Sequence, residues 1–64
     1  MKITLNGEPI EVVAMTLSGL LEEQGQSGRV ATAVNEVFVP ANARSECRLA
    51  PGDRIEILAP MQGG

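Results

Sequence analysis

The sequence contains no histidine, tryptophan or tyrosine, and only one cysteine and one phenylalanine in 64 residues. A single cysteine excludes an internal disulfide. The lack of histidine removes both the usual zinc-finger ligand set and the imidazole base that activates a serine or cysteine nucleophile. A domain of this size buries roughly 60% of the surface that its unfolded chain exposes, so we expect one small domain with a modest core. A conventional hydrolase and a structural zinc site are therefore not expected.

Basic residues are also few, with 5 Lys and Arg against 8 Asp and Glu, which gives a net charge of -3. Nucleic-acid binding depends on clustered Lys and Arg, so this balance disfavours it. The longest uncharged stretch, residues 12–21, is half the length of a membrane-spanning helix, which needs about 20 apolar residues. Residues 6–8 interrupt the apolar region that a secretory signal would need. We expect a soluble, cytoplasmic protein with a reduced cysteine and no nucleic-acid or membrane partner.

The first part of the chain predicts a β-hairpin. Residues 2–5 and 10–12 alternate polar and apolar side chains, and Asn6-Gly7 between them favours the positive φ angles of a tight turn. Pro9 has no N–H to donate to a strand ladder, so we expect it at the start of the second strand.

A short helix is predicted next, because Leu17, Leu20 and Leu21 recur at helical spacing after Thr16, a suitable N-cap. Gly25 is a suitable end for this helix, and residues 26–29 predict a loop. Two helical turns are marginal in water alone, so the leucines must pack on a sheet.

The second half of the chain predicts three more strands. Residues 30–34 and 37–39 are rich in β-branched side chains and are joined by a tight turn, although their register stays open. Residues 41–49 have no clean period and predict a loop or one irregular helical turn. The segment Pro51-Gly52-Asp53 predicts a turn that Asp53 serves. In the final strand, residues 54–58, we expect Ile55 and Ile57 on one face and Leu58 on the other.

This order of elements predicts an α+β fold of the β-grasp type, a mixed sheet of four to five strands with one main helix packed on one face. We expect residues 1–58 to form the domain and residues 59–64 to form a flexible C-terminal Gly-Gly tail. The predicted core consists of apolar residues from all of these elements: Ile3, Leu5, Ile10, Val12, Leu17, Leu20, Leu21, Leu49, Ile55 and Ile57.

The predicted tail holds the one group that is placed for chemistry. Its six residues extend at most about 20 Å, and Gly63 and Gly64 can pass through a narrow channel. The Gly64 carboxylate is a poor electrophile until a partner enzyme converts it to an acyl-adenylate with ATP. We therefore predict a carried protein substrate rather than an enzyme. The alternative is a tail without function that ends in two glycines by chance.

Several motifs resemble the ThiS family of thiamine-biosynthesis sulfur carriers, notably Val34-Asn35, Val39-Pro40, Gly52-Asp53 and the terminal Gly63-Gly64. The resemblance covers essentially the whole chain and implies a β-grasp, ubiquitin-like fold. The family often has a basic residue and an aromatic residue shortly after Val-Pro, whereas Ala41 and Asn42 follow Pro40 here. Partner pairing in that loop therefore stays open.

The resemblance also implies a reaction sequence. A ThiF-type, E1-like adenylyltransferase would adenylate Gly64 with ATP and Mg²⁺, which the partner uses and this chain does not hold permanently. A cysteine desulfurase or another sulfur donor would then supply the sulfur of a thiocarboxylate, and thiazole synthase would take that sulfur. Alternatives are a MoaD-like carrier for molybdopterin synthesis, a non-covalent β-grasp interaction module, and conjugation to other proteins.

Four residues are candidates for partner binding: Leu58 at the root of the tail, and Met61, Gln62 and Gly63 within it. For Leu58 and Met61, the alternative is that they are ordinary exposed apolar residues. Among the remaining residues, we expect Cys47 to be structural and Glu22 and Glu23 to serve solubility. Phe38 belongs either to the core or to an interface, according to its register.

Overall fold

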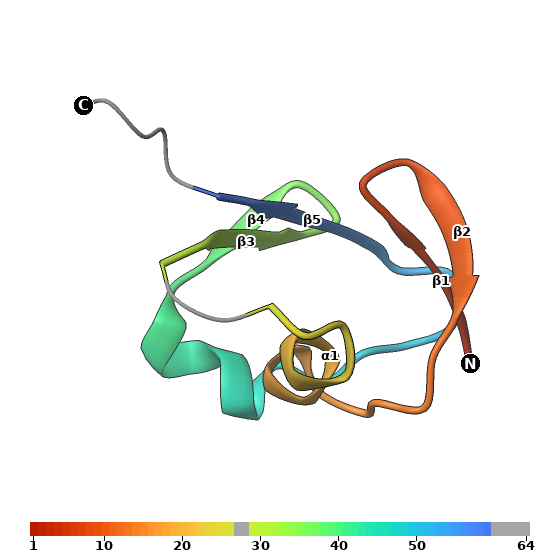
Figure 1. Cartoon of the computed structure of the whole chain (residues 1–64), viewed down its shortest axis with the longest axis horizontal. Helices are drawn as coiled ribbons and strands as arrows, with labels where there is room; N and C mark the ends of the chain where they lie inside the picture. The colour runs from red at the N-terminus through yellow and green to blue at the C-terminus, as the bar shows by residue number, and fades with distance from the viewer. Residues whose placement is uncertain (27–28, 60–64) are drawn as a thin grey trace.

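The computed structural model describes residues 1–26 and 29–59, and within them five strands form one mixed sheet. The strands are β1 (Lys2–Leu5), β2 (Glu8–Glu11), β3 (Ala31–Val34), β4 (Val37–Val39) and β5 (Arg54–Leu58). Their order across the sheet is β2-β1-β5-β3-β4; β1 and β5 are parallel, and the other neighbours are antiparallel. The helix α1 (Leu17–Glu23) and the 3₁₀ helix η1 (Ala41–Glu46) lie on the same face of this sheet (Figure 1).

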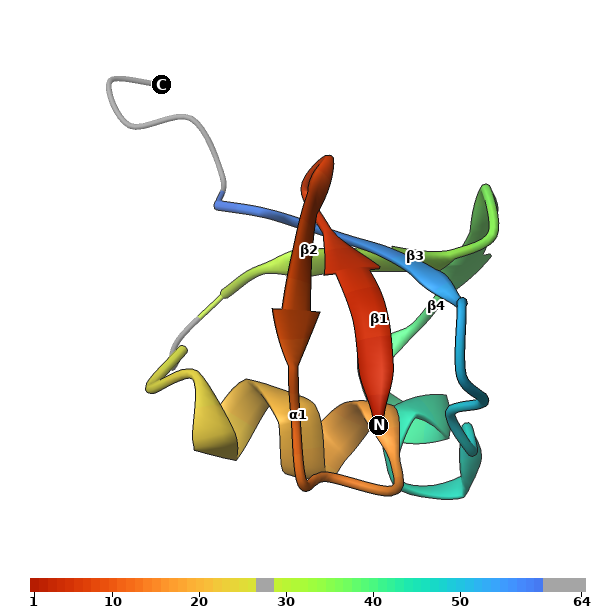
Figure 2. The same ribbon diagram turned by 90° about the vertical axis from the view of Figure 1, so that its right-hand side faces the viewer.

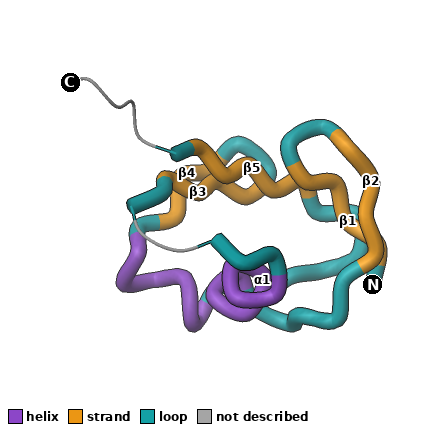
Figure 3. Tube along the Cα trace, viewed as in Figure 1, coloured by secondary structure: helices purple, strands orange, loops and turns teal. Residues whose placement is uncertain are grey.

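The path of the chain is that of a β-grasp fold, which confirms the predicted α+β class. The hairpin β1–β2 leads through α1 to the hairpin β3–β4, and η1 then leads to β5, which inserts between β1 and β3 (Figure 3). The last strand thus lies at the centre of the sheet, and its end is the point from which the chain continues toward Gly64. No helix among the described residues is long and apolar enough to cross a membrane.

The β1–β2 hairpin forms at the predicted turn, where Asn6 has a φ of 50° and Gly7 a φ of 87°. The second strand begins at Glu8, one residue before Pro9, so Pro9 lies within β2 and pairs with Thr4 rather than starting the strand. The sheet accepts this proline because β2 is an edge strand, where a missing N–H leaves no neighbouring carbonyl unpaired.

The register of the second hairpin places Phe38 on the outside of the molecule. Val34 pairs with Val37 across a turn in which Asn35 and Glu36 both have positive φ values, 51° and 72°. This two-residue turn fixes Phe38 opposite Ala33, and the Phe38 side chain is 65% exposed. The sequence left open whether Phe38 belongs to the core, and the structure shows that it does not.

The predicted helix is confirmed at both ends. The Thr16 hydroxyl accepts a hydrogen bond from the Gly19 amide at 3.1 Å, and Gly25 follows the helix with a φ of 70°. The buried core contains eight of the ten predicted residues: Ile3, Val12, Leu17, Leu20, Leu21, Leu49, Ile55 and Ile57. Leu5 and Ile10 are only partly buried and pack against this core from its margin.

Glu23 has a structural role that the sequence analysis did not predict. Its carboxylate accepts hydrogen bonds from the amides of Val13, at 3.1 and 3.2 Å, and Ala14, at 2.8 Å. Both amides belong to the loop between β2 and α1, so Glu23 ties this loop to the last turn of the helix. The prediction of a pure solubility role is therefore wrong for Glu23, whereas Glu22 is exposed, as expected.

The irregular segment after β4 is the six-residue 3₁₀ helix η1, and Arg44 fastens it to the sheet. The Arg44 guanidinium donates to the hydroxyl of the buried Thr32 at 3.0 Å and to the Val30 carbonyl at 2.6 Å. Cys47 follows η1 and packs half-buried against the core, while its carbonyl accepts the Leu17 amide at 2.9 Å. This packing agrees with the expected structural role of Cys47.

Candidate functional site

The end of β5 carries the one predicted site residue within the described part of the chain. Ile55 and Ile57 are buried beneath the sheet, and Leu58 faces the opposite side with 66% of its surface exposed, as predicted. Ala59, the last described residue, is also exposed. The other predicted site residues, Met61, Gln62, Gly63 and Gly64, lie outside the described residues.

Leu58 belongs to a larger apolar surface on the face of the sheet opposite α1. The register pairs Leu58 with Ala31, and it pairs Ala33 with both Glu56 and Phe38. Because neighbouring partners in a sheet share a face, Ala31, Ala33, Phe38 and Leu58 form one group, which we name the outer apolar patch. The described helices and loops leave this face uncovered (Figures 1 and 2).

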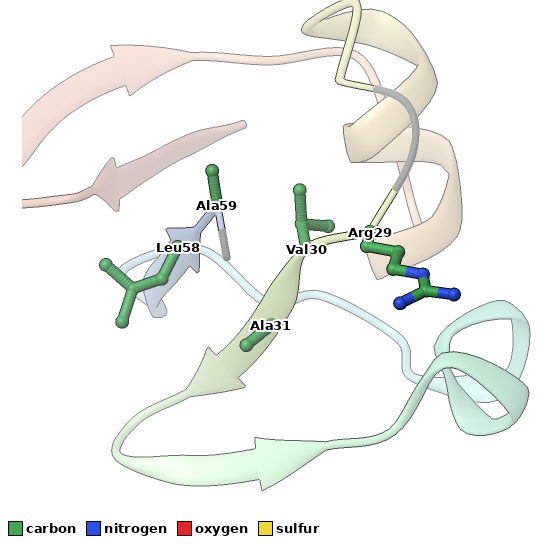
Figure 4. A pocket seen from close by; sticks show the side chains of 5 residues that line it. All are labelled: Arg29, Val30, Ala31, Leu58 and Ala59. Carbon is green, nitrogen blue, oxygen red and sulfur yellow. The ribbon is translucent and has the colours of Figure 1, made fainter. Parts of the chain in front are cut away.

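Two shallow hollows open beside Leu58. One, of about 270 Å³, is lined by Arg29, Val30, Ala31, Leu58 and Ala59, and Figure 4 shows the Arg29 guanidinium and the Leu58 side chain at its opposite sides. The other, of about 130 Å³, is lined by Ala31, Thr32, Ala33, Phe38, Glu56 and Leu58. The small alanine side chains between larger residues leave this space, which suits an apolar side chain of another molecule.

Few charges interrupt the outer apolar patch. Glu56 lines the smaller hollow and Arg29 the larger one. Arg54 lies on the same face as Glu56, and its guanidinium is 3.7 Å from the Glu36 carboxylate in an exposed ion pair, a type of contact that contributes little to stability. Within residues 1–26 and 29–59, no three His, Cys, Asp or Glu side chains lie together as a metal site would require. The described part of the chain therefore presents an exposed apolar surface with few charges on the sheet face opposite α1.

The start of β5 is fixed by a network between two turns. The Asp53 carboxylate accepts from the Ala50 amide at 2.9 Å, which confirms its predicted role in the turn. It also accepts from the Asn35 side chain at 3.1 Å, and the Asn35 oxygen accepts from the Arg54 amide at 2.9 Å. These contacts join the β3–β4 turn to the beginning of β5. Asn35 is 18 positions from Asp53 and 19 positions from Arg54 in the sequence.

Sequence reasoning missed three members of the outer apolar patch. Ala31 and Ala33 received no role, and Phe38 stayed undecided between core and interface. The alternation of Ala31, Thr32 and Ala33 gave the opposite signal, because a polar residue between two apolar ones is expected to face solvent. Here Thr32 faces the core, where Arg44 and the Val39 carbonyl satisfy its hydroxyl.

A β-grasp domain with one main helix packed on one face of its mixed sheet is a ubiquitin-like protein. The sequence matches the ThiS family over residues 3–64. Among solved structures, the crystal structure of the thiamine biosynthesis protein ThiS from Geobacter metallireducens is similar, with a TM-score of 0.87, 28% sequence identity and coverage of 100% of both chains. A search of curated proteins gives no match. The chain belongs to the ThiS family.

Proposed function

We propose that this protein carries sulfur for thiazole formation in thiamine biosynthesis, as a thiocarboxylate on the C-terminal Gly64. The observation that carries the proposal is the ThiS family match, which continues through residue 64 and so includes the Gly63-Gly64 pair. The similar structure covers the whole chain and is described as a thiamine biosynthesis protein. In this role the protein is a co-substrate of its partner enzymes and not a catalyst.

The proposed chemistry takes place in two steps at the Gly64 carboxylate. A carboxylate oxygen attacks the α-phosphorus of ATP, pyrophosphate leaves with its Mg²⁺, and a glycyl-adenylate forms. In the second step, the terminal sulfur of a cysteine desulfurase persulfide attacks the glycyl carbonyl and AMP leaves, and a thiol reductant then cleaves the S–S bond of the resulting acyl disulfide to release the thiocarboxylate. Glycine suits this step because it has no side chain to hinder attack at its carbonyl. A ThiF-type adenylyltransferase supplies the site for the first step, and thiazole synthase takes the sulfur.

The outer apolar patch is the surface on which we propose that the adenylyltransferase docks. Leu58 and Phe38 are 66% and 65% exposed on one face, and the hollows beside Leu58 can accept apolar side chains from a partner. Leu58 is also the last residue of β5, so a partner bound to it is directly beside the segment that leads to Gly64.

The docking role predicts a kinetic effect for Leu58→Ser. Burial of a leucine side chain in an interface contributes about 1.5–3 kcal/mol, so we expect KM for the carrier to rise about 10-fold or more while kcat changes little. The measurement is steady-state adenylation with the carrier as the varied substrate. Val13→Ser is the matched control, because Val13 is 86% exposed but lies in the loop between β2 and α1. Equal KM values for the two variants would refute the docking role of Leu58.

The proposed function is tested by the intact mass of the protein after incubation with a ThiF-type enzyme, ATP-Mg²⁺, a cysteine desulfurase and cysteine. We expect a mass gain equal to the replacement of one oxygen by sulfur, and tandem mass spectrometry should place it on Gly64. A gain only with the corresponding enzyme of molybdopterin synthesis would make the protein a MoaD-like carrier. If neither enzyme modifies the chain while a known carrier reacts, the carrier function is wrong and the interaction module becomes the better explanation.

A further inference from the structure

The side chain of Asn6 holds the end of β5 from the tip of the β1–β2 hairpin. Its amide nitrogen donates to the Ile57 carbonyl at 3.2 Å, and its oxygen accepts from the Ile57 amide at 2.9 Å. The two residues are 51 positions apart in the chain. Figure 2 shows β5 running beside this hairpin, so the contact joins the first turn of the protein to its last strand.

The contact between Asn6 and Ile57 lies at the edge of β5 beyond the end of its pairing with β1. The parallel pairing of β1 with β5 ends at Leu5 and Ile55, and the Asn6 amide then donates to the Ile55 carbonyl at 2.9 Å. Successive residues of a strand direct their backbone groups to opposite edges, so Ile57 again faces the side of β1. Because β1 does not extend that far, the Asn6 side chain takes the place of a peptide group and satisfies both the N–H and the C=O of Ile57.

We propose that Asn6 is a positioning residue, which fixes the end of β5 and therefore the point from which residues 60–64 continue toward the partner. Ile57 is the second-last residue of β5, and on this edge the Asn6 contact is the last one before the described chain ends at Ala59. The functional part of this inference rests on the proposed sulfur-carrier role.

The consequence for the reaction follows from the geometry of acyl transfer. Five residues after Ala59 reach at most about 17 Å at full extension, so the position of Ala59 sets the volume that the Gly64 carboxylate can reach. Displacement of a reacting group by about 1 Å can reduce a rate 100-fold. A loosened end of β5 therefore lowers the fraction of bound carriers whose carboxylate meets the nucleotide, and this loss appears in kcat.

The chain itself offers a matched comparison at Asn35. Asn6 and Asn35 have nearly the same φ, 50° and 51°, and each uses its side-chain oxygen to accept an amide of β5. Asn35 holds Arg54 at the start of the strand, whereas Asn6 holds Ile57 near its end. Glycine tolerates a positive φ, so Asn6→Gly and Asn35→Gly each remove a side-chain anchor and keep the backbone turn.

The experiment compares Asn6→Gly, Asn35→Gly and wild type at a temperature where all three are folded. We expect Asn6→Gly to raise amide hydrogen exchange of Ile57 about tenfold and to lower kcat for adenylation about tenfold, with KM changed less than about twofold. Asn35→Gly should raise exchange at Arg54 and keep the wild-type kcat. If Asn6→Gly does not fold, Asn6→Asp is compared with wild type instead. It keeps the oxygen that accepts the Ile57 amide and loses the donor to the Ile57 carbonyl, so we expect a smaller fall of kcat, and a wild-type kcat would overturn the positioning role.

The positioning role is overturned if Asn6→Gly has the wild-type kcat, or if both glycine variants lose kcat equally, which would indicate a general effect of stability. Failure of the proposed function gives a different result. If the wild-type chain is not adenylated at all, the carrier role fails. The amide hydrogen exchange of Ile57 still decides whether Asn6 holds the end of β5, because an unchanged exchange rate in Asn6→Gly would overturn this anchor as well.

Discussion

Deletion of Gly64 should abolish thiocarboxylate formation and leave the fold intact. The deletion moves the terminal carboxylate to Gly63, one residue and about 3.5 Å short of its place in the full chain. Acyl transfer requires the reacting atoms to approach within a few ångströms, so a carboxylate that falls short by this distance does not reach the nucleotide. The core residues lie between Ile3 and Ile57, so the folded domain does not depend on Gly64.

Two measurements check this prediction together. Intact mass after the sulfur-transfer mixture should show no gain for the shortened chain, and its thermal unfolding midpoint should equal that of wild type. Gly64→Ala is the control for length, because it keeps the carboxylate in place and adds only one methyl group beside the reacting carbonyl. We expect slower but detectable modification of Gly64→Ala. Full modification of the shortened chain would mean that the sulfur is not carried at Gly64.

Leu20→Ala should bring the domain close to unfolding. Leu20 is 0% exposed at the centre of α1, where it joins Leu17 and Leu21 in the core beneath the sheet. Truncation of a buried leucine to alanine costs about 2–5 kcal/mol, the lost burial plus the cavity left behind. At about 0.05–0.15 kcal/mol per residue, a chain of this length has a total stability of only about 3–10 kcal/mol. One substitution thus removes a large share of the free energy of unfolding.

The measurement for Leu20→Ala is urea unfolding followed by circular dichroism. We expect a large fall in the unfolding midpoint, and folded and unfolded chains in coexistence if the wild-type stability lies at the low end of the range. Glu22→Ala is the matched control, since Glu22 is exposed on the same helix and makes no contact with the core. The free energy of unfolding of Glu22→Ala should stay within about 0.5 kcal/mol of wild type. Equal midpoints for the two variants would show that α1 does not depend on its buried face.

Local chemistry predicted most of the elements of this fold. Thr16 and Gly25 mark the ends of the helix because a hydroxyl can cap amides and a glycine tolerates positive φ. Asn6-Gly7 and Gly52 mark turns for the same conformational reason. The alternation of Arg54 to Leu58 separated the buried isoleucines from the exposed Leu58, because strand side chains alternate between faces.

The mistakes and gaps share a physical cause, which is that they concern contacts between distant residues. Glu23 looks like any exposed helix charge until the loop after β2 places the Val13 and Ala14 amides beside it. Pro9 could join β2 because the tertiary fold made β2 an edge strand. The local pattern of side chains shows neither the amides that Glu23 binds nor the edge position of β2 in the sheet.

The sequence by itself therefore determined the helix, the strands, the turns, most of the core and the resemblance to the ThiS family, because each of these depends on residues a few positions apart. Only the tertiary structure decided which strands are neighbours. The insertion of β5 between β1 and β3 brings Leu58 beside Ala31 and places Asn6 on Ile57, 51 positions away. Strand pairing of this kind is a property of the whole folded chain, since each register is fixed by turns and by burial on the shared face of the sheet.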